Sequence, residues 1–196
     1  MFNFLNNNEK FFVIDVGSHK VAGISFEFKD NVPSIISMEH QKSRGINQNK
    51  FNNVDELSLA INKVYKRISK GYKKNEVFCS ITDPKVFTKK IKTEINSGRL
   101  GISRKEIRKI FRKSITESKV HGKDLIYTSP NDFILDDKNL VSDPLGKVCS
   151  KLCLVSFNIF ASHYYTDKLR TSFEKKKINI KNFFDSGVAS SIACVS

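Results

Sequence analysis

The sequence predicts an α/β protein in which a small compact segment interrupts a larger domain. Residues 8–82 read as three strands, a helix and a fourth strand. Residues 83–146 read as strand, helix and one or two strands, and residues 147–196 as strand, helix, strand, helix. A length of 196 residues allows one domain with a substantial core or two small ones. We therefore expect a main domain at 8–82 and 147–196, and an inserted domain at 83–146.

The opening hairpin, residues 11–26, carries the residues best suited to phosphate chemistry. Asp15 ends a buried strand, where its carboxylate can hold a water molecule or a hydrated Mg²⁺. Gly17 lets the backbone approach an anion closely, and Ser18 and Lys20 add a hydroxyl and a positive charge. The alternative is an ordinary hairpin whose turn is polar.

The rest of the first segment continues this α/β pattern. Residues 32–40 read as a strand, and Pro33 restricts it to a strand start or a sheet edge. Asn53 is a good N-cap for the following amphipathic helix, and Glu56 is placed to reach back to it. Residues 76–81 then form a fourth, largely buried strand.

The inserted segment begins with a half-exposed strand over 86–95. Ser103 and Glu106 form a capping box at the start of a helix. Residues 125–135 supply another strand or two, broken near Pro130. The apolar stripe of the helix is expected to comprise Ile107, Ile110, Phe111 and Ile115.

The last segment is expected to return to the main domain. Residues 148–157 form a strongly apolar strand, and Ser162 can cap the helix that follows. A further strand covers 178–184, after which Asp185 or Ser186 begins a helix of small residues.

Positive charge is concentrated in one stretch of the chain. Residues 84–123 hold 13 basic and 3 acidic side chains, whereas the whole chain carries a net charge of +14. Such a stretch can bind nucleic acid, an anionic membrane surface or an acidic partner. The alternative is a lysine-rich composition without a ligand, which is favoured because no aromatic residues interleave the basic ones for base stacking. The candidate partner-binding residues are Arg104, Arg108, Arg112 and Lys113.

Several classes of protein are disfavoured by composition. No apolar run approaches the ~20 residues of a membrane span, and residues 1–8 lack the basic and apolar regions of a signal peptide. No convincing Ser/His/Asp set points to an independent hydrolase. The cysteines lie in apolar runs without a pairing pattern, so we expect reduced core residues in a cytoplasmic protein. They are Cys79, Cys149, Cys153 and Cys194.

Five short motifs narrow this prediction to one family: DVGSHKV at 15–21, SRGI at 43–46, NDFILD at 131–136, DPLG at 143–146 and SGVASS at 186–191. In order and spacing, the sequence resembles the FtsA family of bacterial cell division proteins, within the actin/Hsp70-like ATPase superfamily. The resemblance implies the N-terminal half of an actin-like (ribonuclease H-like) ATPase fold. Subdomain 1A would comprise 8–82 and 147–196, and the inserted strand-helix-strand-strand (SHS2-type) subdomain 1C would comprise 83–146.

The same resemblance implies a function. FtsA-like proteins bind ATP with Mg²⁺, link the FtsZ ring to the cytoplasmic face of the inner membrane, recruit later division proteins and self-associate through subdomain 1C. Carried over by motif, Asp15, Gly17, Ser18 and Lys20 would form the phosphate side of the site. Asp15 would hold Mg²⁺ through water.

The sequence also departs from the family pattern. It ends before the second phosphate loop, the subdomain that receives the FtsZ tail and the membrane-binding helix, so membrane contact is expected only through a segment absent here. We expect weak or no ATP binding by these residues alone, because affinity requires both sides of the cleft. Ser186 occupies the place of a glutamate that orients water in related ATPases. We therefore assign no catalytic residue, and enzymatic activity is not expected. The alternative function is a basic module that binds nucleic acid or an anionic surface through 84–123, with nucleic acid the less favoured ligand.

Overall fold

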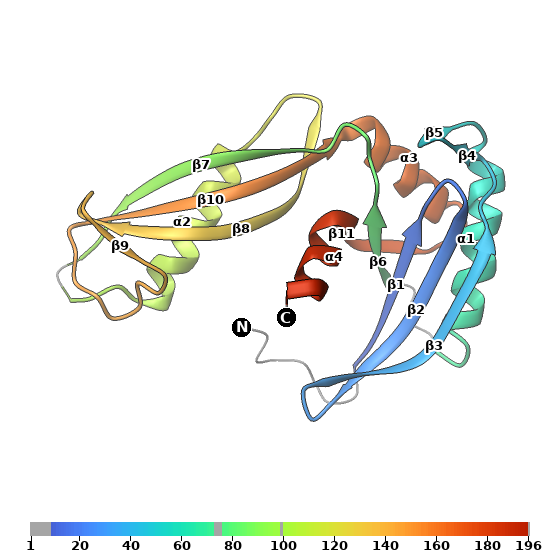
Figure 1. Ribbon diagram of the computed structural model, residues 1–196, viewed down its shortest axis with the longest axis horizontal. Helices are drawn as coiled ribbons and strands as arrows, with labels where there is room; N and C mark the ends of the chain where they lie inside the picture. The colour runs from blue at the N-terminus through green and yellow to red at the C-terminus, as the bar shows by residue number, and fades with distance from the viewer. Residues whose placement is uncertain (1–8, 73–75, 99, 196) are drawn as a thin grey trace. The chain divides into compact units, whose positions relative to one another are not determined.

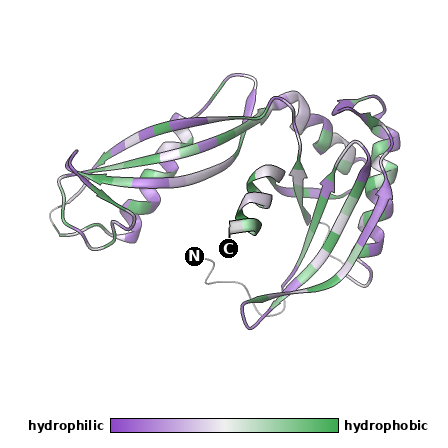
Figure 2. Cartoon of the chain, in the orientation of Figure 1, coloured by the Kyte–Doolittle hydropathy of each residue, from purple (hydrophilic) through white to green (hydrophobic). Residues whose placement is uncertain are grey.

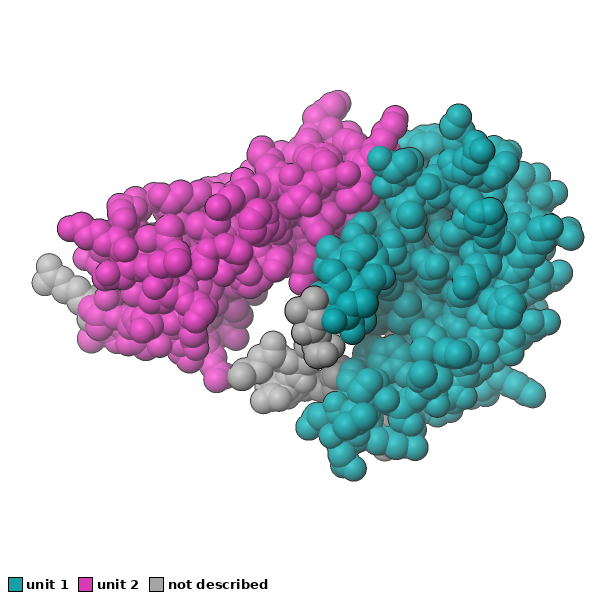
Figure 3. Space-filling view, viewed as in Figure 1, with its two compact units in different colours: residues 1–84, 164–196 teal, residues 85–163 magenta. Residues whose placement is uncertain are grey.

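The computed structural model describes residues 9–72, 76–98 and 100–195, so the predicted absence of a signal peptide at 1–8 lies outside the described residues. The chain divides into two compact units (Figure 3). Unit 1 comprises residues 1–84 and 164–196, and unit 2 comprises residues 85–163. Apolar and polar residues alternate along the strands of both units, which is typical of sheets with one face buried (Figure 2).

Unit 1 is built on a five-stranded sheet in the order β11-β6-β1-β2-β3 (Figure 1). Strands β1, β2 and β3 form an antiparallel meander, whereas β6 and β11 extend the sheet in parallel from β1. As expected from Pro33, β3 is an edge strand. The strands are β1 (Lys10–Val16), β2 (Lys20–Lys29), β3 (Val32–Lys42), β6 (Glu76–Ile81) and β11 (Asn179–Asp185).

The alternation of buried and half-buried residues along β1 shows which face of this sheet is buried. Phe12, Ile14 and Val16 are buried, and the residues between them are only half-buried. Helix α1 (Val54–Ile68) packs closely on the buried face, since a Cβ on Gly23 of β2 would lie 2.5 Å from Val64 of α1. The remaining elements of unit 1 are α3 (His163–Glu174), α4 (Ser186–Val195) and the short hairpin β4 (Ile46–Asn47) and β5 (Lys50–Phe51).

The N-terminus of α1 is capped as predicted, but only in one direction. The Asn53 side chain accepts hydrogen bonds from the backbone N–H groups of Asp55 at 3.0 Å and Glu56 at 3.2 Å. Among the described residues, the Glu56 carboxylate accepts no hydrogen bond from Asn53 in return. Asn53 alone therefore caps this helix.

Unit 2 has its own antiparallel sheet, in the order β7-β10-β8-β9. Helix α2 (Arg104–Glu117) covers one face, and Ile110, Leu152 and Leu154 are fully buried between them. The strands are β7 (Phe87–Asn96), β8 (Lys123–Leu135), β9 (Asn139–Val141) and β10 (Lys151–Ser162).

The pairing of β10 in the sheet of unit 2 places the second boundary between the units later in the chain than expected. We predicted that residues from 147 onward return to the main domain, but β10 pairs with β7 on one side and β8 on the other. An apolar strand fits the centre of either sheet, so its composition did not decide between them. The predicted break at Pro130 is also wrong, because β8 is one strand. Its register shifts between Val155 and Ser156 of β10, opposite Pro130, which accommodates a residue without an N–H group.

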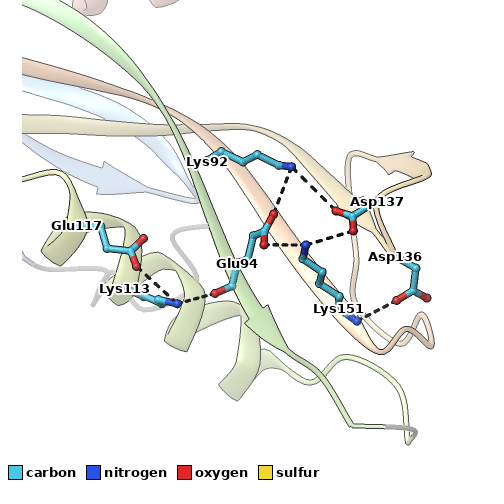
Figure 4. A network of polar contacts seen from close by, with 7 residues as sticks. All are labelled: Lys92, Glu94, Lys113, Glu117, Asp136, Asp137 and Lys151. Carbon is cyan, nitrogen blue, oxygen red and sulfur yellow. Dashed lines mark hydrogen bonds and ion pairs between the residues drawn. The ribbon is translucent and has the colours of Figure 1, made fainter.

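The face opposite α2 carries a network of charged side chains (Figure 4). Lys151 contacts Glu94 at 2.7 Å and Asp137 at 3.2 Å, and Lys92 contacts the same two carboxylates at 3.2 and 4.0 Å. Cys153 is buried beneath this network, and burial raises the pKa of its thiol. The four charges of this network therefore neutralise one another.

The predicted capping box of α2 is present. The Ser103 hydroxyl accepts from the Glu106 N–H at 3.3 Å, and the Glu106 carboxylate accepts from the Ser103 N–H at 2.8 Å. The Ser103 N–H and the hydroxyls of Ser97 and Ser103 all donate to this carboxylate and lower the pKa of Glu106 to about 2. The stabilising charge is present above the ordinary pKa of 4.5 and is lost as pH falls through about 2.

Replacing Glu106 by glutamine is therefore expected to remove a pH-dependent contribution to stability. At pH 7, Glu106→Gln should lower the free energy of unfolding by up to about 1 kcal/mol, the usual value of an N-terminal cap. The difference from wild type should shrink between pH 4.5 and 2, as measured by urea unfolding. Glu56→Gln, at the same position of α1, is the matched control and should change little. Equal pH profiles for wild type and Glu106→Gln would contradict this assignment.

Two smaller expectations were also wrong. Cys194 is exposed on α4, whereas Cys79, Cys149 and Cys153 are buried as predicted. Ile115 is 46% exposed and lies outside the apolar stripe of α2.

In the described part of the chain, no helix combines the length and apolar composition needed to cross a membrane.

Candidate functional site

The carboxyl ends of three neighbouring parallel strands bring aspartates to one edge of the unit 1 sheet. Asp15 is the penultimate residue of β1, Asp83 follows β6 by two residues, and Asp185 ends β11. Ligands of open α/β sheets bind at this edge, beyond the carboxyl ends of parallel strands. The predicted phosphate residues therefore lie where the topology favours a site.

Asp15 and Lys20 face away from α1. Both line a concave surface of about 460 Å³ that runs across β1, β2 and β3 on the open face of the sheet and also includes Ala22, Ile24 and His40. Among the described residues, the Asp15 carboxylate forms no hydrogen bond or ion pair. It is thus available to a cation or to ordered water.

Gly17 and Ser18 already have partners within the chain. The Gly17 N–H donates to the Lys20 carbonyl at 3.0 Å and closes the hairpin turn. The Ser18 hydroxyl accepts from the Asn49 N–H at 2.9 Å and donates to its side-chain oxygen at 3.2 Å. The structure therefore brings Asp15 and Lys20 together at the open face, and uses Gly17 and Ser18 to shape the turn between them.

Sequence reasoning missed two neighbours of Asp15. Asp83 is 7% exposed, and Tyr165 of α3 is buried with a hydroxyl that has no hydrogen-bond partner in the described chain. Burial raises the pKa of Tyr165, and the charges of Asp83 and Asp15 raise it further. Burial also raises the pKa of Cys79, again with a contribution from Asp15. Asp83 could have been found from its position just after a buried strand. Nothing in the sequence marked Tyr165 as a site residue beyond its helical spacing.

The start of α4 completes this edge. The Asp185 carboxylate accepts from the Val188 N–H at 3.0 Å and so caps the helix. The hydroxyls of Ser186 and Thr82 lie 3.1 Å apart and connect the ends of β11 and β6. The small residues of α4 thus begin at the carboxyl edge, as the sequence predicted for Asp185 or Ser186.

The second predicted set lies on α2 in unit 2. Arg104, Arg108 and Arg112 are exposed and form no ion pair with any described residue. Lys113 differs from them, because its ammonium donates to the Glu94 carbonyl at 2.7 Å and pairs with Glu117 at 3.5 Å (Figure 4). Lys113 therefore protects the edge of β7 and is not free to bind a partner in this arrangement.

Comparison with known structures defines the class of fold. The chain superposes on a protein of the PilM-PilN type IV pilus biogenesis complex with a TM-score of 0.58, over 91% of this chain and 48% of that one, at 10% identity. A Bacteroides thetaiotaomicron protein with an actin-like ATPase fold and unknown function matches 94% of this chain at a TM-score of 0.29. With the strand order of unit 1, the first match confirms the predicted actin-like fold.

Comparison with curated sequences is more specific. The chain is 25% identical to the cell division protein FtsA of Helicobacter pylori strain J99 over 93% of its own length. It spans 42% of that protein. No protein-family profile matches the chain. The resemblance to FtsA found from short motifs is thus confirmed by similarity over nearly the whole sequence.

Proposed function

We propose that the chain is an FtsA-like, actin-like cell division protein and that unit 1 supplies one side of a nucleotide site. The observation that carries this proposal is the meeting of Asp15, Asp83 and Asp185 at the carboxyl edge of three parallel strands. Similarity to FtsA over 93% of the chain supports the cell division role. Such a protein would link the FtsZ ring to the inner membrane and recruit later division proteins.

The residues at this edge fit Mg²⁺-ATP from one side. Asp15 would hold the ion through water, and Lys20 would contact a phosphate oxygen. The described residues contain no group of three acidic, histidine or cysteine side chains suited to direct metal binding. Phosphate oxygens and water would then complete the coordination, as is usual for Mg²⁺. Gly17 and Ser18 would act by holding the turn in shape.

Titration of the isotopically labelled chain with Mg²⁺-ATP tests this assignment by NMR. Amide shifts are expected at residues 15–20, 83 and 185–188, with affinity in the millimolar range or weaker because only one side of the ligand is covered. Lys20→Ala should weaken binding, whereas Lys29→Ala, at the other exposed end of β2, should not. Shifts elsewhere would contradict the site, and micromolar affinity by calorimetry would contradict a one-sided cleft.

We further propose that unit 2 corresponds to the inserted SHS2-type subdomain and contributes self-association and partner recruitment. Its long elements β7, α2, β8 and β10 follow the order strand, helix, strand and strand, with the short strand β9 between β8 and β10, which supports this proposal. Pull-down of purified division proteins by the chain tests it, with Arg108→Gln as the variant and Arg67→Gln on α1 as the control. A partner that is retained equally by both variants would not bind through α2.

A further inference from the structure

The end of unit 2 where α2 begins carries exposed aliphatic side chains on two adjoining loops. Leu100 is fully exposed, and Leu145 and Val148 are 43% and 66% exposed. The loops are joined by hydrogen bonds from the Ile102 N–H to the Lys147 carbonyl and from the Gly146 N–H to the Ile102 carbonyl, both 2.8 Å. Leu145 and Val148 are therefore next to a backbone contact between the loops, and Leu100 is two residues from one.

Both loops are anchored in the core of unit 2. Ile102 is 1% exposed and Cys149 is 4% exposed, and both belong to the core of unit 2. The backbones of Gly101 and Gly146 approach so closely that a Cβ on Gly101 would lie 3.0 Å from the Gly146 carbonyl oxygen. The two loops thus hold three exposed aliphatic residues on one fixed support, and grouped apolar exposure is what marks an interaction site.

Cations surround this aliphatic tip. Arg104 and Lys105 begin α2 and Lys147 lies between the two apolar residues of the second loop, all exposed and without an ion pair among the described residues. The two carboxylates nearby, Asp143 and Glu106, accept backbone hydrogen bonds within the loops. The three cations outnumber these two carboxylates, so the tip presents a net positive charge beside apolar side chains.

Two cations of α2 oppose the stability of the helix. Arg104 and Lys105 share the first turn with Glu106, next to the positive end of the helix dipole, and the last turn has no basic residue. Some other charges of unit 2 are paired, as in the network of Lys92, Glu94 and Lys151 (Figure 4), whereas Arg108 and Arg112 are exposed like the cations of the tip. Cations that are unpaired and unfavourable for their own helix fit an external anion better than a structural role.

We propose that this tip of unit 2 binds an anionic lipid surface, with Leu100, Leu145 and Val148 entering the headgroup region and Arg104, Lys105 and Lys147 contacting lipid phosphates. Apolar side chains beside cations are the composition that such interfaces require. Nucleic acid is less well matched, because the tip offers no aromatic platform for bases. The proposal is independent of the nucleotide site, and it departs from the expectation that membrane contact needs a segment absent here.

A single tryptophan tests the insertion directly, since the chain has none. With Leu100→Trp in the full chain, fluorescence should shift to the blue on vesicles of phosphatidylcholine and phosphatidylglycerol, and not on phosphatidylcholine alone. Lipid-attached quenchers should reduce the signal. An emission spectrum that anionic vesicles leave unchanged would overturn the proposal.

Vesicle sedimentation separates this site from general charge attraction. Arg104→Gln with Lys105→Gln and Lys147→Gln should weaken partitioning by about a hundredfold, at roughly fivefold per cation. Leu100→Ser with Leu145→Ser and Val148→Ser should also weaken it, whereas Lys89→Gln with Lys90→Gln and Lys119→Gln, distant from the tip, should have a much smaller effect. An equal loss in the control, no loss in the serine variant, or tighter retention by duplex DNA than by vesicles would each overturn the proposal. Circular dichroism would verify that every variant is folded.

Discussion

Replacing Gly45 by alanine is expected to destabilise unit 1 by roughly 3 kcal/mol or more. Gly45 has a φ of +77°, and a Cβ built on it would lie 1.8 Å from the carbonyl oxygen of Asn53. Its own carbonyl accepts hydrogen bonds from the N–H groups of Asn52 at 2.8 Å and Asn53 at 3.0 Å. The added methyl group would therefore displace the backbone that carries the cap of α1.

Gly71→Ala is the matched control, because it separates steric overlap from backbone strain. Gly71 has a φ of +86°, but no atom lies within 4 Å of the position of its Cβ. Its replacement should cost only about 1 kcal/mol, the penalty of a left-handed conformation. Denaturant unfolding would measure both, and hydrogen exchange should show the loss of protection of Gly45→Ala concentrated in α1. If the two variants lowered the free energy of unfolding equally, the steric overlap with Asn53 would not contribute to the destabilisation.

Periodicity predicted the elements of this fold well, because local patterns decide them. The strands of the opening hairpin, the Asn53 cap and the Ser103–Glu106 capping box all depend on residues within a few positions of each other. The actin-like fold followed from their order. Residues 43–46, quoted only as a family motif, contain Gly45, and the close contact with Asn53 gives a physical reason for glycine there.

Pairing between distant segments was less predictable. β10 reads as a buried strand in any sheet, and only the registers with β7 and β8 assign it to unit 2. The same limit applies to the site. The sequence predicted that Asp15 and Lys20 act together. It did not predict the hydrogen bond between Ser18 and Asn49, because these two residues are 31 positions apart. Nothing in the local sequence distinguishes a hydroxyl that binds an anion from one that holds a loop.

The face of α2 shows how a correct pattern can still include a wrong residue. Ile107, Ile110, Phe111 and Ile115 share a helical spacing, yet Ile110 is fully buried and Ile115 is 46% exposed. Ser114 is buried in the last turns instead, and its hydroxyl lies 3.0 Å from that of Ser156 on β10. A pair of hydroxyls satisfies both polar groups, so a polar residue is stable in this position.

Ile110→Ala is accordingly expected to lower the free energy of unfolding of unit 2 by about 3 kcal/mol, because it leaves a cavity between α2 and the sheet. Ile115→Ala is the same substitution further along α2. It should alter the free energy of unfolding by less than about 0.5 kcal/mol, since the Ile115 side chain is half-exposed to water and alanine favours the helix. Hydrogen exchange of the β10 amides, which lie at the centre of this sheet, would report the stability of unit 2 separately from that of unit 1. If Ile115→Ala cost as much as Ile110→Ala, the helix would face the sheet as its sequence pattern alone suggests, and the buried Ser114–Ser156 contact could not form.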